Sequence, residues 1–596
     1  MHSTSPQLIL GICDSHDAGA ALICDGRILA AANEERFNRK KMAAGFPVRC
    51  LEEIWRIAGV KPADVHAVAL ASRSSASAAI PINNDFTNDD GTSSPTKRLA
   101  EWLDRTPGGR SVLASDAAQT LYRGLMPMMV RGKAGRIRGL LLCMGVTAPL
   151  QSFDHHDSHV ASAYYTSGER DCLVISNDGF GDGLCAKVAI PDGPGGALRV
   201  ISSNHFANSL GAYYNYVTHF CGFNKSHHAG KTTGLAAYGD PEKTLPIFQR
   251  LIDWDAERGI YVNRGKLFGN CLRELHEKLA GVSREDAAAG IQRHCENILV
   301  LMARHYIQRT GRRKIVLTGG IHANVKINQR IAEIPEVESV FVFPNMGDGG
   351  LALGAAFLAS AKTNPGGTVP VRLDDVYLGP AYSEREISDC LNRAGVAFSR
   401  PDRLAAEVAR LLKENKIVAR FDGRMEYGPR ALGNRSILYP ATNPSVNQWL
   451  NTQLRRTEFM PFAPVVREAD AATFFHNYDK KTAHTAEFMT ITYNVTDRCK
   501  KEAPAIVHVD GTARPQVLRR AVNPGYYDIL EEYYQLTGLS VLVNTSFNMH
   551  EEPIVCTPDD ALKAFFESHL DALAIGPFLV RNPRTTKGSG FKAQFA

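Results

Sequence analysis

The sequence is poor in the features that mark several classes of protein. Its twelve cysteines are scattered over 596 residues without a single Cys-x-x-Cys pair, so no disulfide framework is indicated. Basic and acidic residues nearly balance, 68 against 62, and the net charge of +6 gives no support to a strongly basic nucleic-acid-binding surface. The longest apolar stretch, Gly139–Leu150, is too short and too broken to span a bilayer, and the N-terminus lacks the basic start of a signal peptide. We therefore expect a soluble, cytoplasmic protein with no membrane partner.

The chain does have the composition of a large globular protein. Hydrophobic residues make up 44% and charged residues 22%, and the length allows roughly two to four domains. The stretch Lys362–Pro370 is a linker by composition, which predicts one domain over residues 1–365 and a second over residues 370–596. Ser72–Thr96 is rich in Ser, Asn, Asp and Pro, and we expect a surface excursion or lid there.

A pattern of three apolar strands occurs twice in the first domain. The first copy covers residues 8–13, 20–24 and 28–32, with Asp25-Gly26 as the hairpin turn. The second covers residues 173–176, 185–190 and 198–202, around a glycine-rich turn at residues 178–183. Hairpins are common enough to recur by chance, but two that each begin near an Asp favour an internal duplication. Strands alternate with helical patterns on both sides of the linker, which predicts an α/β fold in both domains.

A histidine cluster is the sharpest chemical signal in the sequence. It reads His155-His156-Asp157-Ser158-His159 and precedes a helix-compatible run, Val160–Tyr165. On a helix, His155 and His159 share a face one turn apart, which suits two imidazoles on one metal ion. Clustered histidines near a helix start can also be plain polar caps. The Glu of a His-Glu-x-x-His protease is absent, so that reaction is not implied.

Two carboxylates at glycine turns could complete such a metal site. Asp178 opens the second glycine-rich hairpin, and Asp348 lies in a tight turn before the apolar helix expected at residues 351–359. Two His and two Asp would suit Fe²⁺, Zn²⁺ or Mn²⁺, and spacing alone does not choose among them. For Asp348, a simple helix N-cap is an equally good interpretation of the local sequence.

Phosphate-binding signals in the first domain are incomplete. Thr318-Gly-Gly320 follows an expected strand at residues 314–317, and such a turn lets a nucleotide approach the backbone. Ala229–Gly234 resembles part of a Walker loop, but Lys225 stands where the first Gly is required, which excludes a P-loop NTPase. Lys231 could still contact a phosphate, or it could be a solvated lysine.

The second domain carries an arginine series within FDGRMEYGPRALGNRS. Its members are Arg420, Arg424, Arg430 and Arg435. Because a guanidinium fork matches phosphate oxygens two at a time, this loop could clamp an acyl phosphate or a triphosphate, or it could be an ordinary surface loop. Further polar groups at expected strand ends lie in residues 508–514 and 544–548.

His16 and Asp14 follow the first expected strand. At such a bend, a His and an Asp could take the proton of an acceptor hydroxyl, and a hydrogen-bonded structural His is the alternative interpretation.

Taken together, these motifs resemble the O-carbamoyltransferases of antibiotic, toxin and nodulation-factor biosynthesis, the NodU/CmcH/TobZ type. The matching stretches run in family order from residue 8 to about residue 580. They are SHDAGAALICDGRILAAANEERFNRKK, HHDSHVASAYY, GKTTGLAAYG, TGGIHANVKIN, FPNMGDGGLALGAA, GRMEYGPRALGNRSIL, RTEFMPFAPVV, HVDGTARPQV and VNTSFNMHEEPIV.

The resemblance implies an actin-like, TsaD-like domain at residues 1–365 and a YrdC-like domain from residue 370. In such enzymes the second domain makes carbamoyl-adenylate from carbamoyl phosphate and ATP with Mg²⁺. The first domain passes the carbamoyl group to the hydroxyl of a small-molecule acceptor near a divalent metal, usually Fe²⁺. The resemblance leaves a homodimer open and does not name the acceptor, whose pocket we assign as a hypothesis to residues 72–139.

The resemblance also assigns roles to individual residues. The metal positions are matched by His155, His159, Asp178 and Asp348, and the acceptor-activating pair by Asp14 and His16. The residues matched to nucleotide or carbamoyl-adenylate binding in the first domain are Lys231, Gly234, Gly319, Gly320 and Asn324. Those matched to carbamoyl phosphate and ATP binding in the second domain are Arg424, Arg430, Arg435, Arg456, His508, Asp510, Arg514, Asn544, Ser546 and Asn548.

Two departures from the family pattern concern details of nucleotide contact. The chain has His228-Ala229 where many relatives have an acidic residue, and Met460 where some have Arg. Two other functions stay open at this point, namely threonylcarbamoyl transfer to tRNA and a nucleotide-binding regulatory ATPase of the actin-like type. The near-neutral charge argues against tRNA, and the His155/His159 pair argues against the regulatory ATPase.

Overall fold

The computed structural model describes residues 7–73, 102–106, 108–115, 117–118, 120–121, 123–124, 132–364, 366–454 and 461–583. Arg456, Met460 and most of the expected excursion at Ser72–Thr96 lie outside these ranges. The chain forms two compact units. The first consists of Met1–Ile28, Ala44–Val48 and Val60–Arg372, and the second of Leu29–Ala43, Arg49–Gly59 and Leu373–Ala596. The main boundary thus falls beside the linker, but the sequence did not predict that two short N-terminal segments belong to the second unit.

Two sheets of the same topology supply most of the strands of the first unit, and only β3 of the first sheet runs on into a segment counted with the second unit, Leu29–Ala43. One has the order β3 (Arg27–Asn33), β2 (Gly19–Cys24), β1 (Leu8–Cys13), β4 (Ala67–Leu70), β5 (Leu150–Ser152). The other has the order β8 (Leu198–His205), β7 (Leu184–Pro191), β6 (Leu173–Gly181), β11 (Lys314–Thr318), β12 (Ser339–Val342). In each sheet the first strand of the copy (β1 or β6) pairs antiparallel with the next strand and parallel with the fourth. The expected internal duplication and the α/β class of this unit are therefore confirmed.

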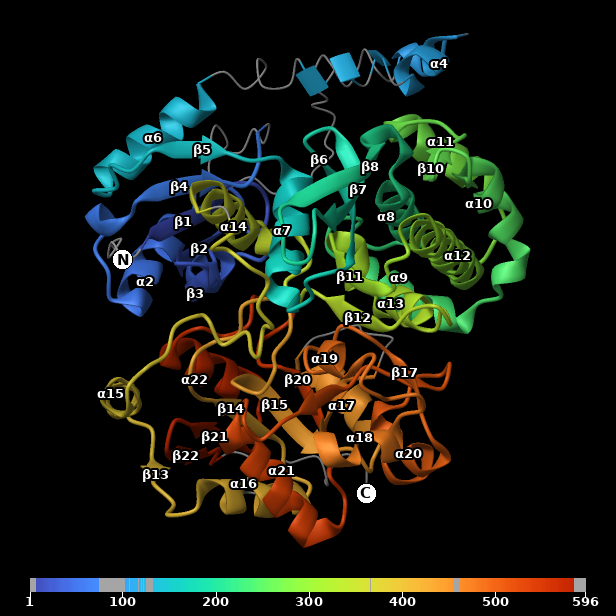
Figure 1. Ribbon diagram of the computed structural model, residues 1–596. Helices are drawn as coiled ribbons and strands as arrows, with labels where there is room; N and C mark the ends of the chain where they lie inside the picture. Colours follow the sequence, from blue (N-terminus) through green and yellow to red (C-terminus); the bar gives the residue numbers. More distant parts are fainter. Residues whose placement is uncertain are drawn as a thin grey trace. The chain divides into compact units, whose positions relative to one another are not determined.

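Two helices lie between these sheets (Figure 1). Helix α14 (Leu351–Thr363) packs on β1, β2 and β4, while α7 (His155–Ser167) packs on α14 and on β6, β7 and β11. The helices can approach closely because Gly354 has no side chain, since a Cβ there would lie 1.8 Å from the carbonyl oxygen of Ser158. Helix α7 starts at Asp154, whose side chain accepts from the N–H groups of His156 and Asp157, and it ends at Gly168, where φ is 76°.

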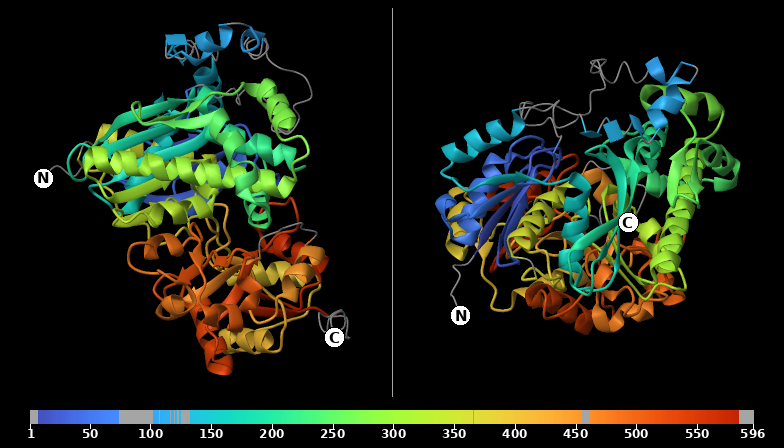
Figure 2. Two further views of the ribbon diagram at one scale, coloured as in Figure 1. Left: turned by 90° about the vertical axis from the view of Figure 1, so that its right-hand side faces the viewer. Right: turned by 45° about the horizontal axis from the view of Figure 1, so that its top comes forward.

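A second group of helices packs beside the β6 sheet, and it is visible in both views of Figure 2. It comprises α8 (Leu210–Phe220), α9 (Ala229–Leu235), α10 (Leu245–Leu251), α11 (Phe268–Lys278), α12 (Arg284–Thr310) and α13 (Val325–Ala332). Helix α12 contacts α8, α9, α10 and α13, so it forms the centre of this group. The hairpin of β9 (Ile252–Asp255) and β10 (Ile260–Asn263) packs on α10 and α12 of this group. Helix α6 (Lys133–Cys143) lies elsewhere in the unit and contacts β5.

The second unit contains a mixed sheet of eight strands. Their order is β13 (Phe398–Ser399), β22 (Phe578–Arg581), β21 (Ala572–Ile575), β14 (Val418–Phe421), β15 (Arg435–Pro440), β20 (Val541–Ser546), β16 (Ala463–Arg467), β19 (Gln516–Leu518). Its larger helices are α15 (Glu384–Arg393), α16 (Leu404–Lys413), α17 (Ser445–Gln453), α21 (Pro524–Thr537) and α22 (Pro558–Glu567). The α/β fold expected in this half is confirmed. The short helix α1 (Glu35–Asn38) and most of α2 (Val48–Ala58) also belong to this unit.

None of the helices in the described part of the chain combines the length and the hydropathy that crossing a membrane requires.

Candidate functional site

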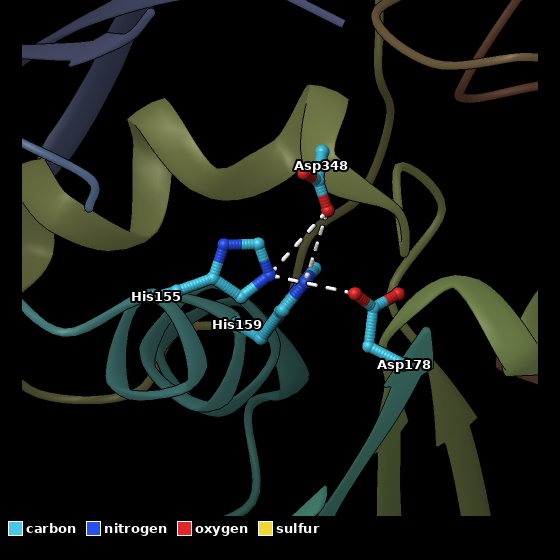
Figure 3. Close-up of side chains that lie close together, drawn as sticks. All are labelled: His155, His159, Asp178 and Asp348. Carbon is cyan, nitrogen blue, oxygen red and sulfur yellow. Dashed lines mark ion pairs between the residues drawn. The ribbon is translucent and has the colours of Figure 1, made fainter. Parts of the chain in front are cut away.

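Four buried side chains from three parts of the first unit converge on one point (Figure 3). His155 and His159 extend from α7, Asp178 from β6, and Asp348 from the short 3-10 helix η7 (Asp348–Gly350). One potential ligand atom from each lies within 4.8 Å of the others. The tertiary fold thus brings together the four residues that the sequence suggested as metal ligands.

The distances in this cluster suit a shared cation better than direct hydrogen bonds. The Nε2 atom of His155 lies 3.5 Å from Asp178 Oδ2 and 3.5 Å from Asp348 Oδ1, and Nε2 of His159 lies 3.5 Å from the same Asp348 oxygen. Both Nε2 atoms are buried without a hydrogen-bond partner. Tetrahedral ligands on bonds of about 2.1 Å are about 3.4 Å apart. Two imidazoles and two carboxylates arranged in this way fit a divalent ion such as Fe²⁺, Mn²⁺ or Zn²⁺.

The glycine turns hold the ligands in place. The β6–β7 register shifts between Asn177 and Gly181, and this irregularity includes Asp178. The N–H of Gly320 donates to Asp178 Oδ1 at 2.8 Å, which leaves Oδ2 for the cluster. Gly181 is required beside the first histidine, because a Cβ there would lie 2.2 Å from the His155 ring. The N–H of His155 donates to Asp182 Oδ2 at 2.8 Å.

The charges of the cluster stabilise one another. Burial lowers the pKa of His155, but the charges of Asp348 and Asp178 outweigh it and raise that pKa to about 9. Burial raises the pKa of both carboxyls, yet the neighbouring imidazoles hold each of them below its ordinary value. His156 behaves differently. Burial and the two neighbouring histidines lower its pKa to about 3, and its Nδ1 lies 3.0 Å from Ser176 Oγ.

His16 joins this site, but the carboxylate beside its other nitrogen is not the expected one. Its Nε2 lies 3.2 Å from Asp348 Oδ2, and its Nδ1 lies 3.2 Å from Asp17 Oδ2. Asp14 Oδ1 instead pairs with the buried Lys133 Nζ at 3.0 Å. Asp17, in the left-handed turn after β1 with φ of 55°, is thus the carboxylate beside His16 Nδ1, and Asp14 lies beside Lys133, which the sequence patterns did not single out. The proton-accepting role expected of His16 and Asp14 stays a prediction.

The residues expected to bind a nucleotide in the first unit are only partly brought together. Gly319 has φ of 91°, and a Cβ there would lie 2.1 Å from the carbonyl oxygen of Asn177, so this turn runs directly against the strand that carries Asp178. Lys231 and Gly234 are buried in helix α9 rather than in a phosphate loop. Asn324 caps α13, and its Nδ2 donates to Gln292 Oε1 at 2.7 Å.

Two further side chains belong to the Asn324 network. Tyr214 donates to Gln292 Oε1 at 2.7 Å, and its hydroxyl lies 2.7 Å from Thr233 Oγ1. The sequence analysis missed Tyr214 and Gln292, because each occupies an ordinary position in a helical pattern.

Three of the four arginines in the second unit's arginine series stabilise the chain itself. Arg435 is fully buried, and its guanidinium donates to the carbonyl oxygens of Asp422, Gly423, Asn434 and Pro380. Arg424 donates to the carbonyl oxygens of Gly379, Leu378 and Leu29. Arg420 donates to Gly433 O and pairs with Asp422 at 2.7 Å. Arg424 and Arg435 thus shape the loop, Arg430 lies half-buried on it, and the phosphate clamp stays a prediction.

The remaining predicted residues of the second unit lie in turns and at strand ends. His508 Nδ1 lies 3.2 Å from Asp510 Oδ1, which also accepts from the hydroxyl of Thr512 at 2.6 Å. Arg514 follows this turn. Asn548 donates to the carbonyl oxygens of Met549 and Glu552.

Two of the predicted residues lie on β20. Asn544 donates to Gln516 Oε1 at 2.8 Å. Ser546 is paired in register with Ser436 of β15. Arg456, the tenth residue predicted for this unit, lies outside the described residues.

Comparison with known sequences identifies the family of this α/β protein. The family model described as "Carbamoyltransferase N-terminus" matches residues 8–357, and the one described as "Carbamoyltransferase C-terminus" matches residues 409–582. The chain belongs to the carbamoyltransferase family and is an enzyme of the transferase type.

Curated relatives support this assignment over most of the chain. Nodulation protein NolNO of Sinorhizobium fredii is 30% identical over 95% of this chain and 79% of its own length. Nodulation protein NolO of Bradyrhizobium diazoefficiens is 34% identical over 72% of this chain and 78% of its own length. Among solved structures, full-length HypF in the phosphate- and nucleotide-bound form is 14% identical, covers 61% of this chain and 47% of its own, and has a TM-score of 0.30.

Proposed function

We propose that this protein is an ATP-dependent O-carbamoyltransferase. It forms carbamoyl-adenylate from carbamoyl phosphate and ATP and transfers the carbamoyl group to a hydroxyl of a small-molecule acceptor. The observation that carries the proposal is the buried His155/His159/Asp178/Asp348 cluster, with His16 at its edge, in a chain of the carbamoyltransferase family.

The two-step route follows from the chemistry of the carbamoyl group. Carbamate, released from carbamoyl phosphate together with phosphate by hydrolysis, is a poor electrophile because its anionic oxygen is a bad leaving group. Attack of that oxygen on the α-phosphorus of ATP releases pyrophosphate and leaves a carbamoyl group whose leaving group is AMP. We assign this step to the second unit, with Arg430, Arg514 and Ser546 as the residues that contact phosphate oxygens.

Transfer to the acceptor is assigned to the first unit. We assign to His16 Nε2, the ring nitrogen that faces Asp348 Oδ2, the role of accepting the proton of the acceptor hydroxyl as the oxygen attacks the carbamoyl carbon and AMP leaves. Asp17 orients the ring through Nδ1. The exposed fraction of the His16 side chain is 44%, which gives an acceptor access to it. A divalent cation held by His155, His159, Asp178 and Asp348 would polarise an oxygen of the reacting groups as a Lewis acid.

The direct test is a product analysis. Purified protein is incubated with ATP, Mg²⁺, carbamoyl phosphate and a panel of polyhydroxylated acceptors, and mass spectrometry monitors the gain of one carbamoyl group. We expect AMP and pyrophosphate in equal amounts and one AMP for each carbamoylated product. Carbamoylation without AMP would overturn the adenylate route, and AMP formation without any carbamoylated small molecule would overturn the acceptor class.

A further inference from the structure

A short segment from the N-terminal part of the chain contacts both stretches that flank the proposed adenylate-forming residues. The segment consists of α1 (Glu35–Asn38) and Arg39 and belongs to the second unit. One of the contacted stretches is the arginine loop, residues 423–434, which carries Arg430. The other, residues 549–556, follows directly after Ser546 and Asn548 and is called the β20 extension here.

Arg36 contacts the arginine loop close to Arg430. Only 5% of Arg36 is exposed, and its Nη2 donates to the carbonyl oxygen of Gly428 at 2.8 Å. Gly428 has φ of 138°, a left-handed backbone that favours glycine. Glu35, 3.2 Å from Nη1, compensates the buried charge. Burying a guanidinium is costly unless it is paired and hydrogen-bonded, so this placement fixes the turn two residues before Arg430.

Arg39 contacts the β20 extension with both ends of its fork. Nη1 donates to Ile554 O and Nη2 to Pro553 O, each at 2.7 Å. Asp560 Oδ1 lies 3.5 Å from Nε. Arg39 itself has φ of 61°, a conformation that non-glycine residues adopt only when the surroundings hold them there.

Phe37 lies between these two arginines in the sequence and links both stretches. Its ring packs against a buried apolar cluster. Met425 and Ala431 of this cluster come from the arginine loop, and Ile554 and Cys556 come from the β20 extension. One side chain therefore covers an apolar contact between the two stretches, on the same segment whose arginines bind their carbonyl oxygens.

Hydrogen bonds to Glu426 hold one side of the arginine loop, and Arg36 contacts the loop on the other side of Arg430. Glu426 Oε1 accepts from the N–H groups of Leu432, Asn434 and Arg435. These contacts fix the side of the loop that enters β15. The bond from Arg36 acts on the other side of Arg430, at Gly428, so the position of Arg430 depends on both.

We propose that Arg36 and Arg39 are positioning residues for carbamoyl-adenylate formation. They hold the arginine loop and the β20 extension at the separation that carbamoyl phosphate and ATP require. The segment Glu35–Arg39 then contributes to the proposed adenylate-forming site, although more than three hundred residues separate it from the contacted stretches in the sequence. This inference rests on the proposed function, because it assumes that Arg430 and Ser546 contact the substrates.

The test uses the full chain and compares Arg36→Lys and Arg39→Lys with Arg385→Lys, a matched control on α15 of the same unit, where 91% of the side chain is exposed. A lysine keeps the charge but has a single nitrogen, so it cannot bond both carbonyl oxygens that Arg39 bonds, nor reach both Gly428 O and Glu35 as Arg36 does. We expect an unchanged Tm and a rise of about tenfold to a hundredfold in KM for carbamoyl phosphate or ATP, measured by AMP formation. Hydrogen exchange should accelerate in residues 423–434 for Arg36→Lys and in residues 549–556 for Arg39→Lys.

Each outcome decides between the alternatives. Faster exchange with unchanged KM would make the two arginines merely structural, and unchanged exchange would show that they do not hold these stretches. A lowered Tm with uniformly faster exchange would also overturn the proposal. If the unmodified protein forms no AMP, the proposed function fails, while the exchange pattern still tests whether the segment positions the two stretches.

Discussion

Three histidines within five residues of α7 have different environments. His155 and His159 face Asp178 and Asp348 because residues four apart share a helix face, whereas His156 points to Ser176. Their chemistry diverges accordingly, since carboxylates raise the pKa of His155 while burial and the other two histidines lower that of His156. Whether a histidine of α7 can serve as a metal ligand therefore depends on its position on the helix.

This difference leads to a prediction about metal content. His159→Ala removes one of the four proposed ligands. It should therefore reduce the bound metal from about one ion per chain to a tenth or less. His156→Gln, whose amide can still bond to Ser176, is the matched control and should retain the metal. Elemental analysis after dialysis measures both. If the two variants retain or lose the metal together, the assignment of the ligands is wrong.

Glu34, one residue before α1, should make the stability of the protein depend on pH. Burial raises the pKa of this carboxyl from 4.5 to about 7, although the N–H of Cys50 donates to it at 2.8 Å. Between pH 4.5 and 7 the folded protein therefore holds a proton that the unfolded chain has released. The free energy of unfolding then falls as the pH rises through this window.

Glu34→Gln removes the ionisation and keeps an acceptor for Cys50. We expect the variant to exceed the unmodified protein in free energy of unfolding by up to about 3 kcal/mol at pH 8, and to match it near pH 4.5. Urea unfolding at the two pH values measures the difference. An equal effect of the substitution at both pH values would contradict this interpretation.

At the scale of elements, glycine turns place the carboxylates of the candidate metal site, as helix α7 places its two histidines. The turn after β11 supplies the N–H of Gly320 to Asp178, and the irregular end of β6 turns Asp178 toward the two histidines. Both turns need glycine. A Cβ at Gly319 would collide with the backbone of Asn177, and a Cβ at Gly181 would collide with the ring of His155.

Gly320 therefore offers a sharp test of this support. A Cβ at Gly320 would lie 2.7 Å from Asp178 Oδ1, whereas a Cβ at Gly347, the residue before Asp348, would meet nothing within 4 Å. Gly320→Ala should weaken metal binding by about tenfold to a hundredfold, as loss of a supporting bond commonly does. Gly347→Ala should leave it unchanged. Competition with a chromogenic chelator measures both affinities, and equal affinities would refute the role of this bond.

At the scale of the whole molecule, the two units carry separate sets of candidate residues. The His–Asp cluster and His16 belong to the first unit, and Arg430, Arg514 and Ser546 to the second. This division predicts that the two half-reactions can be separated.

Removal of the metal proposed at the His–Asp cluster should stop the proposed transfer but not the proposed adenylation. Apo-protein is prepared with a chelator, dialysed and supplied with fresh Mg²⁺ for ATP. We expect AMP formation from carbamoyl phosphate and ATP to persist, carbamoylation of the acceptor to fall at least about a hundredfold, and Fe²⁺ or another divalent ion to restore it. Loss of AMP formation together with transfer would argue against separate sites.

The sequence by itself determined the local structure, and it suggested the four side chains that the fold brings together. Strand hairpins, the duplication, the helix after the histidines and the His155/His159 pair all follow from patterns a few residues long, and such patterns fix which face a side chain occupies. Asp178 and Asp348 became candidates because both lie at glycine turns that the sequence shows, although an N-cap explained Asp348 equally well.

Only the tertiary structure decided which partners these side chains take. Asp17 rather than Asp14 lies beside His16 Nδ1, Arg424 and Arg435 bind backbone carbonyl oxygens, and Arg36 and Arg39 contact residues more than three hundred positions away. A guanidinium or a carboxylate can bind many groups equally well, so its partner is set by whichever backbone the fold brings near it, and sequence spacing carries no record of that.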